Sequence, residues 1–143
     1  MLSYPKSARV RVWSCRTVER ISRSPRVLVV DDFEIGAHAI AAYLTIEPMD
    51  CRIALSGAEA IATGLTWQPD VFVMDISMPI MNGFEVTDSL RRDSRTHNAI
   101  IVAFTALDET KVCRNPMSRS FDGYCQKGQL PAALAALIEH FIL

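Results

Sequence analysis

The sequence predicts an α/β fold in which helices cover both faces of a doubly wound parallel sheet. Two observations support this prediction. Short apolar runs alternate with helix-like segments from residue 26 onward, and several of these runs are continuously apolar. Continuous apolar runs indicate strands that are buried on both faces, as in parallel sheets. At 143 residues, the chain is long enough for one domain with its own core and too short for two ordinary domains.

Five segments are expected to form strands, and they cover residues 27–31, 51–55, 71–74, 99–104 and 122–126. Five helices should alternate with them. At this size, such a chain fits a five-stranded sheet with the flavodoxin-like order 2-1-3-4-5. In open parallel sheets, functional sites lie beyond the carboxyl ends of the central strands. Residues that directly follow the predicted strands are therefore candidates for a functional site.

Periodicity and capping residues place the helices. The first helix is expected over residues 34–46, where apolar residues recur at helical spacing: Ile35, Ala39, Ala42 and Ile46. Ser56, with Glu59 three residues later, has the capping-box pattern of a second helix that runs to about residue 66. Asn82 should cap a third helix that ends near residue 93. The last helix should begin near Pro131 and present one apolar stripe: Leu134, Leu137, Ile138 and Phe141.

Composition limits the class of protein. No apolar run approaches the ~18 residues that a membrane-crossing helix needs, and the N-terminus lacks the apolar stretch of a signal peptide. A cytoplasmic protein without a membrane partner is therefore expected. The four cysteines show neither a C-x-x-C pair nor zinc-ligand spacing, which favours reduced, structural cysteines: Cys15, Cys51, Cys113 and Cys125. Packing is likewise the favoured role for Trp13 and Trp67.

The net charge of −1 hides an uneven distribution. Residues 1–26 hold seven basic residues and one acidic residue, for +6, whereas the remaining residues hold eight basic and fifteen acidic residues, for −7. Residues 1–25 are therefore interpreted as a basic arm before a domain at 26–143. The arm lacks a helical period and regularly spaced aromatic residues, so a disordered, solvated tail is favoured over a nucleic-acid contact.

Polar residues with related chemistry follow four of the predicted strands. Asp31 and Asp32 follow the first strand, Asp75 the third, Thr105 the fourth and Lys127 the fifth. Three acids at one sheet edge would repel each other unless a positive charge lies among them. Hard oxygen ligands suit Mg²⁺ better than metals that prefer thiolate or imidazole. Together the four strand ends carry the groups that phosphoryl transfer requires.

These residues lie in motifs that resemble the receiver domain of two-component response regulators, especially the stand-alone chemotaxis-type members. The motifs are VLVVDDFE, VFVMDISMPIMNGFEV, VAFTAL and FDGYCQKG, and the resemblance covers the chain from residue 26 to its end. The spacing is also typical of that family: 43 residues separate Asp32 from Asp75, 30 more lead to Thr105 and 22 more to Lys127.

The resemblance implies a role for each matching residue. Asp75 would accept a phosphoryl group. Asp31 and Asp32 would form the acidic pair, and Mg²⁺ would be bound by Asp32, Asp75 and the backbone carbonyl of Ser77, with Asp31 beside them. Lys127 would pair with Asp75 and later with a phosphoryl oxygen.

The resemblance also implies a switch and partners. Thr105 would turn toward the acyl phosphate, and the space that it leaves would let the ring of Tyr124 move inward. The phosphoryl donor would be a histidine kinase or a phosphotransfer protein, and the output would be binding to an unidentified downstream protein. A homodimer that depends on phosphorylation stays an open alternative. Because no output domain follows the last helix, a single-domain member is expected, without turnover beyond slow autodephosphorylation.

Three positions depart from the family pattern or modify it. Gly128 replaces the proline that normally follows the lysine, so we expect a trans peptide or a looser loop and a less firmly aimed Lys127. Pro116 should stop the fourth helix after about residue 114 or 115. Leu107 offers no hydrogen bond to the water that would hydrolyse the acyl phosphate, so a long-lived phosphorylated form is expected.

Two other functions remain open on the sequence alone. A constitutive interaction module with the same fold would never be phosphorylated, and Gly128 and Pro116 give this alternative some support. A phosphatase that works through an aspartyl intermediate would want a second acid two residues after the nucleophile, where this chain has Ser77, which disfavours it.

Overall fold

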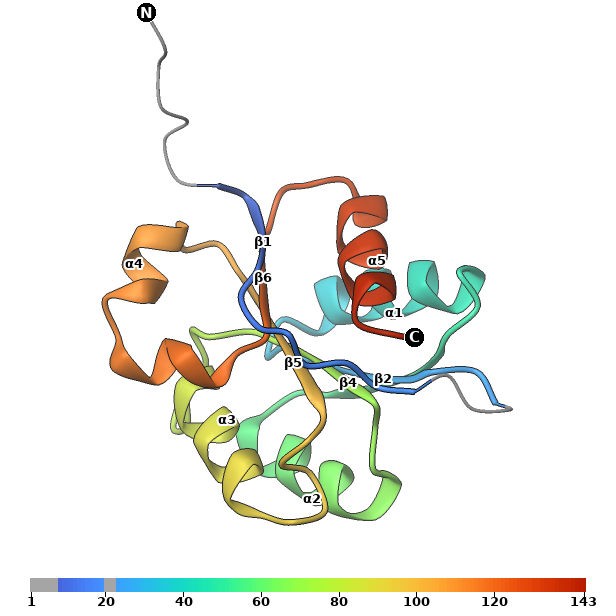
Figure 1. Ribbon diagram of the computed structural model, residues 1–143, viewed down its shortest axis with the longest axis horizontal. Helices are drawn as coiled ribbons and strands as arrows, with labels where there is room; N and C mark the ends of the chain where they lie inside the picture. The colour runs from blue at the N-terminus through green and yellow to red at the C-terminus, as the bar shows by residue number, and fades with distance from the viewer. Residues whose placement is uncertain (1–7, 20–22) are drawn as a thin grey trace, which may run out of the picture.

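The computed structural model describes residues 8–19 and 23–143, and Figure 1 shows how its helices and strands are arranged. The strands are β1 (Val10–Val12), β2 (Arg26–Val30), β3 (Asp50–Ala54), β4 (Val71–Met74), β5 (Ile100–Thr105) and β6 (Gly123–Gln126). The α-helices are α1 (Glu34–Ile46), α2 (Gly57–Trp67), α3 (Gly83–Arg92), α4 (Glu109–Cys113) and α5 (Pro131–His140). A short 3-10 helix, η1 (Pro116–Ser120), follows α4.

The predicted fold class is confirmed, with one additional strand. The sheet has the order β1-β6-β5-β4-β2-β3, and β3, β2, β4, β5 and β6 are parallel neighbours. Numbered from β2, these five strands have the expected order 2-1-3-4-5. The additional strand, β1, pairs antiparallel with β6 at the sheet edge.

Helices pack on both faces of the sheet and bury two apolar layers. Alternate residues of the central strands face α1 and α5 on one side, as Val29, Val73 and Val102 do. Their neighbours Val30, Met74 and Ala103 face the side that holds α2 and α3. Figure 1 shows α1 and α5 together on one side of the sheet and α2 and α3 on the other. Burial on both faces explains why these strands read as unbroken apolar runs.

The α1 helix has its predicted bounds, but the apolar residues whose spacing predicted it are not the residues that it buries. Ile35 is 76% exposed and Ile46 is 79% exposed, and Ala39 and Ala42 are also exposed. The buried residues of α1 are Ala37, Ala41 and Leu44. The helix is apolar over most of its circumference, so two stripes have helical spacing and periodicity cannot choose between them. In contrast, the predicted stripe of α5 is buried as expected.

Residues 8–19 differ from the expectation of a disordered basic arm over residues 1–25. Beyond the β1 pairing with β6, Gln126 N donates to Arg9 O at 2.7 Å and Trp13 N donates to Asp122 O at 2.7 Å. Farther along, Val18 N donates to Phe141 O and Leu143 N donates to Val18 O, both at 2.9 Å. This segment therefore follows the edge of the sheet as far as the C-terminus. Residues 1–7 and 20–22 of the predicted arm lie outside the described residues.

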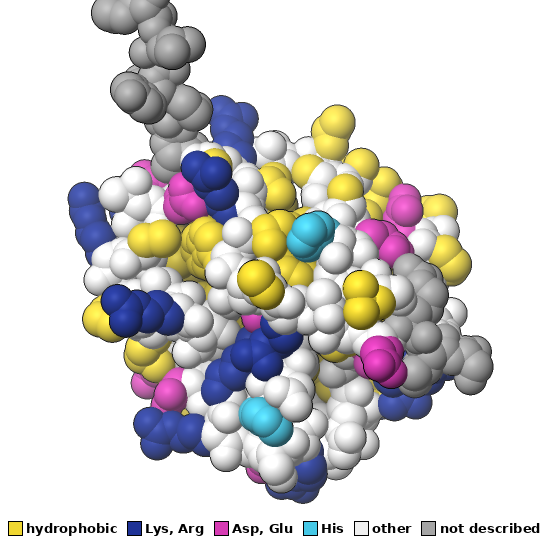
Figure 2. Space-filling view, in the orientation of Figure 1, with side chains coloured by type: hydrophobic (Ala, Val, Ile, Leu, Met, Phe, Trp, Pro, Cys, Tyr) yellow, Lys and Arg dark blue, Asp and Glu magenta, His cyan; other side chains and the backbone are white. Residues whose placement is uncertain are grey.

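Three arginines of the predicted arm form ion pairs with acidic residues of the domain. Arg11 Nε lies 3.2 Å from Glu109 Oε2, Arg16 Nε lies 2.9 Å from Asp122 Oδ1, and Arg23 Nη1 lies 2.8 Å from Asp70 Oδ2. Part of the uneven charge along the sequence is therefore paired within the molecule. Figure 2 shows the basic side chains of this face as separate groups among apolar ones, without a continuous basic stripe.

Pro116 has the predicted effect on the fourth helix. The α4 helix has five residues and ends at Cys113, and η1 begins with Pro116 at its first position. Proline lacks the backbone N–H that would continue the helix, and its ring clashes with the preceding turn. Asn115 instead caps η1 by accepting a hydrogen bond from Met117 N at 2.9 Å. The fourth helix is therefore divided into two short pieces.

The cysteines and the lengths of the helices agree with what the composition predicted. All four cysteines lie in described segments and are free, and Cys125 is the one that is fully buried. Across residues 8–19 and 23–143, no helix has the length and apolar character needed to cross a bilayer; the longest, α1, has 13 residues.

Candidate functional site

The register of the sheet gathers the predicted strand-end residues at one edge. Val30 pairs with Ala54 on one side and with Met74 on the other, and Met74 pairs with Ala103. Because these strands are parallel and aligned, the residues that follow them emerge together. Asp31 and Asp75 directly follow β2 and β4, and Thr105 ends β5. Lys127 follows β6, and its N–H donates to Thr105 O at 2.8 Å.

Three carboxylates meet at this edge. Asp31, Asp32 and Asp75 each place a carboxylate oxygen within 4.8 Å of the others. Asp31 and Asp75 are 4% and 5% exposed, whereas Asp32 faces solvent. Asp31 is fixed by the N–H of Phe33, which donates to its Oδ1 at 2.9 Å. The cluster thus has two buried acids and one acid at the mouth.

The ammonium of Lys127 enters this cluster. Its Nζ donates to Asp31 Oδ2 at 2.7 Å and lies 3.5 Å from Asp75 Oδ1. Burial acts to lower the pKa of Lys127, but the hydrogen bond to Asp31 and the charges of Asp75 and Asp31 outweigh this effect and raise the pKa above its ordinary value. Lys127 therefore stays protonated.

With Gly128 in place of the usual proline, the Lys127 side chain still reaches the acids. The peptide before Gly128 is trans, as expected, and Gly128 has φ +98°, a conformation that glycine adopts without strain. The Lys127 Nζ also lies 5.7 Å from the centroid of the Phe104 ring. This cation–π contact and the hydrogen bond to Asp31 help to fix the side chain.

Asp75 has a perturbed pKa. Burial raises its pKa from the ordinary value of 3.8 to about 6, because the Lys127 charge offsets only part of the desolvation and the neighbouring Asp31 raises it further. One ammonium faces three acids, so the site lacks positive charge. The helix after it is also held close: a side chain at Gly83, where α3 begins, would collide with the backbone carbonyl of Asp75.

The donor set fits a hard divalent cation. Three carboxylates that lie within one ion's reach supply oxygen ligands, and an open side toward solvent leaves room for water ligands, which Mg²⁺ retains. A cation would also supply the positive charge that the site lacks. The contribution of the Ser77 carbonyl stays a prediction.

The two predicted switch residues converge on one residue of the loop between β5 and α4. Leu107 N donates to Thr105 Oγ1 at 3.2 Å, and the hydroxyl of Tyr124 donates to Leu107 O at 2.6 Å. Thr105 is 1% exposed and Tyr124 is 0% exposed. Burial, followed by the nearby charges of Asp108 and Glu109, raises the pKa of the Tyr124 hydroxyl to about 12. The Tyr124 ring is buried in this structure, and its inward movement on phosphorylation stays a prediction.

Trp13 stacks on the Tyr124 ring, a contact that the sequence did not predict. The two rings stack with centroids 5.3 Å apart and an interplanar angle of 15°. Trp13 ends the run VRVW, and an aromatic residue after β-branched residues is a strand signal that points to this segment. The general expectation that Trp13 packs is confirmed, but its partner could not be read from the sequence.

Comparison with protein families identifies this constellation. The family model for the response regulator receiver domain matches residues 27–139. The chain belongs to this family. The match includes all the strand-end residues at the site. Receiver domains have the fold of a signalling switch, not that of a conventional turnover enzyme.

Curated relatives of this receiver domain are also response regulators. It is 39% identical to the response regulator PleD of Caulobacter vibrioides over 85 residues. This matched region covers 59% of this chain and 19% of PleD. It is 32% identical to protein PilH of Pseudomonas aeruginosa over 84 residues. This matched region covers 59% of this chain and 69% of PilH. The chain thus matches about a fifth of the length of PleD, whose other activities carry no implication here.

Solved structures share the fold. A receiver domain from Bermanella marisrubri is 30% identical, with a TM-score of 0.73, over 83% of this chain and 98% of that one. The response regulator TrrA of Thermotoga maritima, solved in complex with Mg²⁺ and BeF, is 26% identical, with a TM-score of 0.75, over 82% of this chain and 98% of that one. The fold of this chain therefore matches that of a domain solved with Mg²⁺ bound.

Proposed function

We propose that this receiver domain is a phosphorylation-dependent switch in which Asp75 accepts a phosphoryl group from a histidine kinase or a phosphotransfer protein. The observation that carries the proposal is the buried contact of Asp75 with Lys127 inside a cluster of three carboxylates. Each feature has a simple structural explanation alone. Together they provide a nucleophile, ligands for a cation and a fixed ammonium within one small space.

The transfer itself is a displacement at phosphorus. A carboxylate oxygen of Asp75 forms the new P–O bond while the P–N bond to the donor's histidine breaks, and the bonding electrons leave with the imidazole nitrogen. Asp75 must be ionised to attack. The Lys127 ammonium favours the ionised form, and Asp75 at the end of a buried strand is fixed in position, which lowers the cost of orientation.

Asp31, Asp32 and Asp75 would hold Mg²⁺, with the Ser77 carbonyl as a further ligand. When bound, the ion would neutralise charge on the phosphoryl oxygens during transfer. Lys127 would shift from the Asp75 carboxylate toward a phosphoryl oxygen, since its ammonium already lies 3.5 Å from Asp75 Oδ1.

The donor would approach over the start of α1. Beside Asp31 and Lys127 lies a hollow of about 270 Å³, and its lining includes both of these residues and Phe33. Phe33 is 60% exposed and Ile35 is 76% exposed beside it, and Ile80 on the loop before α3 is fully exposed. Phe33 lines the hollow itself, and exposed apolar side chains next to a polar site are typical of a protein-binding surface. We infer that the donor protein docks on this rim.

Phosphorylation would change the surface through Thr105. If its hydroxyl turns toward the phosphoryl oxygens, Leu107 N loses its present acceptor. The loop that Leu107 anchors leads into α4, so a local change in charge would shift the packing of the β5–α4 loop, α4 and β6. A downstream protein would bind that altered surface, whether as a heterologous partner or as a second copy.

The experiment that tests the proposal is incubation with Mg²⁺ and acetyl phosphate, followed by intact mass measurement. The expected result is a gain of one phosphoryl group that is lost in Asp75→Asn and without Mg²⁺. Asp88→Asn is a matched control, because Asp88 lies on α3 and pairs with the exposed Arg92. No gain in the wild-type protein, or an equal gain in Asp75→Asn, would overturn the proposal.

A constitutive interaction module is the second candidate, and one observation favours it. Tyr124 is already buried and its hydroxyl is already bonded to Leu107 O, so one half of the switch occupies a settled position without phosphorylation. The same mass measurement separates the two candidates, since only the switch requires an acyl phosphate at Asp75.

A further inference from the structure

The segment of residues 8–19, the β1 segment, covers the side of the domain where the switch residues lie. It pairs with β6 along Val10, Arg11 and Val12, and Arg11 is the register partner of Tyr124. Ser14 Oγ and Arg16 Nε both donate to Asp122 Oδ1, at 2.7 and 2.9 Å. The segment is therefore held by backbone and side-chain bonds on both sides of Trp13.

Trp13 joins three parts of the molecule. Its ring stacks on Tyr124 of β6. Its Nε1–H donates to Glu109 Oε2 at 3.2 Å, and Glu109 is the first residue of α4. Arg11 Nε donates to the same carboxylate at 3.2 Å. The face of the Trp13 ring therefore contacts Tyr124, and the edge of the ring contacts α4.

These contacts form a continuous path from the acidic site to the β1 segment. Thr105 is bonded to Leu107, Leu107 to the Tyr124 hydroxyl, and the Tyr124 ring lies against Trp13. A movement of Thr105 toward Asp75 changes the first bond of this chain. Because Tyr124 is wholly buried beneath Trp13, its ring cannot change position unless Trp13 moves as well.

We propose that Trp13 is a positioning residue of the switch, which holds Tyr124 in its buried position and makes the β1 segment the surface that reports phosphorylation. The proposal rests on the proposed function. It implies a direction: the family resemblance assigns the inward position of Tyr124 to the phosphorylated form, so Trp13, which stacks on the buried ring, should favour that form. Removing Trp13 should therefore weaken binding of a phosphoryl mimic at Asp75.

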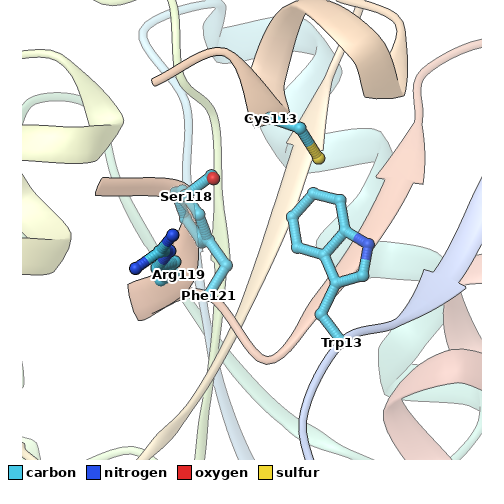
Figure 3. Close-up of a pocket in the computed structure, with 5 residues that line it drawn as sticks. All are labelled: Trp13, Cys113, Ser118, Arg119 and Phe121. Atoms are coloured by element: carbon cyan, nitrogen blue, oxygen red, sulfur yellow. The ribbon is translucent and has the colours of Figure 1, made fainter. Parts of the chain in front are cut away.

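The structure leaves room for Trp13 to move. A pocket of about 290 Å³ adjoins the indole, lined by Trp13, Cys113, Ser118, Arg119 and Phe121. Figure 3 shows the indole at one side of this pocket with the Cys113 sulfur directed toward it, and with Ser118 and Arg119 across from it. The pocket lies beside the broken fourth helix. A change at α4 can therefore be taken up by the indole without disturbing the sheet.

The first test follows Trp13 directly. The full chain is labelled with 5-fluorotryptophan, and ¹⁹F spectra are recorded as beryllium fluoride, a phosphoryl mimic, is added with Mg²⁺. The two tryptophans are Trp13 and Trp67, and a Trp13→Phe variant assigns the two signals. The Trp13 signal should shift in step with binding. Trp67 is buried at the end of α2 and is an internal control whose signal should stay in place.

The second test measures the coupling. The affinity for beryllium fluoride with Mg²⁺ should fall about fivefold in Trp13→Ala, the lower end of usual allosteric couplings. In Trp13→Phe, which keeps an aromatic ring over Tyr124 but loses the N–H to Glu109, the affinity should lie between those of the wild type and Trp13→Ala. A structural loss alone would lower the unfolding midpoint without this graded change in affinity.

The outcomes separate the two proposals. If the wild-type chain binds no beryllium fluoride, both the proposed function and the role of Trp13 fail. If it binds, yet the Trp13 signal stays in place and the affinities of Trp13→Phe and wild type agree with that of Trp13→Ala, the role of Trp13 is overturned while phosphorylation at Asp75 stands.

Discussion

Two buried aspartates at opposite ends of the sheet differ in how fully their charge is satisfied. Asp122, before β6, is 2% exposed and accepts hydrogen bonds from four groups: Ser14 Oγ, Arg16 Nε, Arg91 Nη2 and Ile101 N. Asp75, after β4, is 5% exposed and has one ammonium, which it shares with Asp31. At similar burial, the Asp122 carboxylate therefore links structural elements, whereas the Asp75 carboxylate stays available to bind a positive group.

The difference teaches where function can reside in this fold. A carboxylate whose hydrogen bonds are complete has nothing further to bind, and Asp122 instead joins the β1 segment, α3 and β5. A carboxylate that burial keeps partly unsatisfied can gain by binding a cation or a phosphoryl group. Substitutions at the two positions should therefore change stability in opposite directions.

The largest effect is expected for Asp122→Asn. The Arg91 guanidinium is largely buried, and this substitution would remove its charged partner, so the free energy of unfolding should fall by about 3 to 5 kcal/mol. Urea unfolding measures the loss, and Asp88→Asn in the exposed pair with Arg92 should change little. Hydrogen exchange of β1 should rise in Asp122→Asn. Equal effects of the two substitutions would contradict the structural role of Asp122.

Asp75→Asn should have the opposite sign. Because the folded pKa of Asp75 is raised to about 6, ionisation opposes folding, so the stability that its protonated form contributes is present below pH 4 and is lost as pH rises through about 6. In EDTA at pH 7.5, Asp75→Asn should therefore be more stable than wild type by roughly 1 to 3 kcal/mol.

The advantage of Asp75→Asn should shrink in two conditions. At pH 4.5 wild-type Asp75 is largely protonated and resembles the amide, and with excess Mg²⁺ the ion offsets the repulsion. Thermal unfolding at the two pH values, with and without Mg²⁺, checks both. An advantage of the same size at pH 4.5 and 7.5 would show that the Asp75 charge is not its cause.

The open end of the sheet should also be the end that a donor protein reaches. Ile35→Asp, at the start of α1 beside the acids, should slow phosphotransfer from a cognate phosphodonor protein about tenfold, the effect of losing one apolar anchor. Transfer from acetyl phosphate should be unchanged. Ile46→Asp is the matched control, because Ile46 is equally exposed at the far end of the same helix. Slowing with both donors would point to damage at the site instead.

The smallest effect is expected for the lifetime of the acyl phosphate. Leu107→Glu should speed its hydrolysis about three- to tenfold, since a carboxylate there can accept a hydrogen bond from the attacking water. Ala106→Glu places the same charge one residue earlier, on an exposed position, and should leave the rate unchanged. Loss of phosphoryl mass with time measures both. Equal rates for wild type and Leu107→Glu would refute the role of Leu107.

Much of the fold and site could be predicted because the signals are local. Unbroken apolar runs located β2, β4 and β5, and short polar patterns located helix starts. Asn82 and Glu85 form a complete capping box, with Glu85 N donating to Asn82 Oδ1 at 3.0 Å and Asn82 N donating to Glu85 Oε1 at 3.1 Å. Once the strands are aligned, parallel topology brings Asp31, Asp75 and Lys127 together without further information.

The remainder depends on contacts between distant residues. The β1 strand has three residues, all exposed, so its pairing with β6 leaves no pattern of burial in the sequence. The buried face of α1 depends on which stripe α5 and the sheet cover, which its own residues do not determine. The position of Tyr124 depends on Trp13, which lies at the other end of the chain. The sequence therefore predicted the charged site better than its surroundings.

The β1 strand also changes what the sheet can join. Without it, β6 would present unpaired backbone groups, and such edges recruit strands from other molecules. With β1 in place, the outer edge is three residues long and carries Arg11, and Arg9 lies immediately before it. Short edges with charged side chains disfavour pairing between sheets of different molecules, and β1 gives the sheet an edge of this kind.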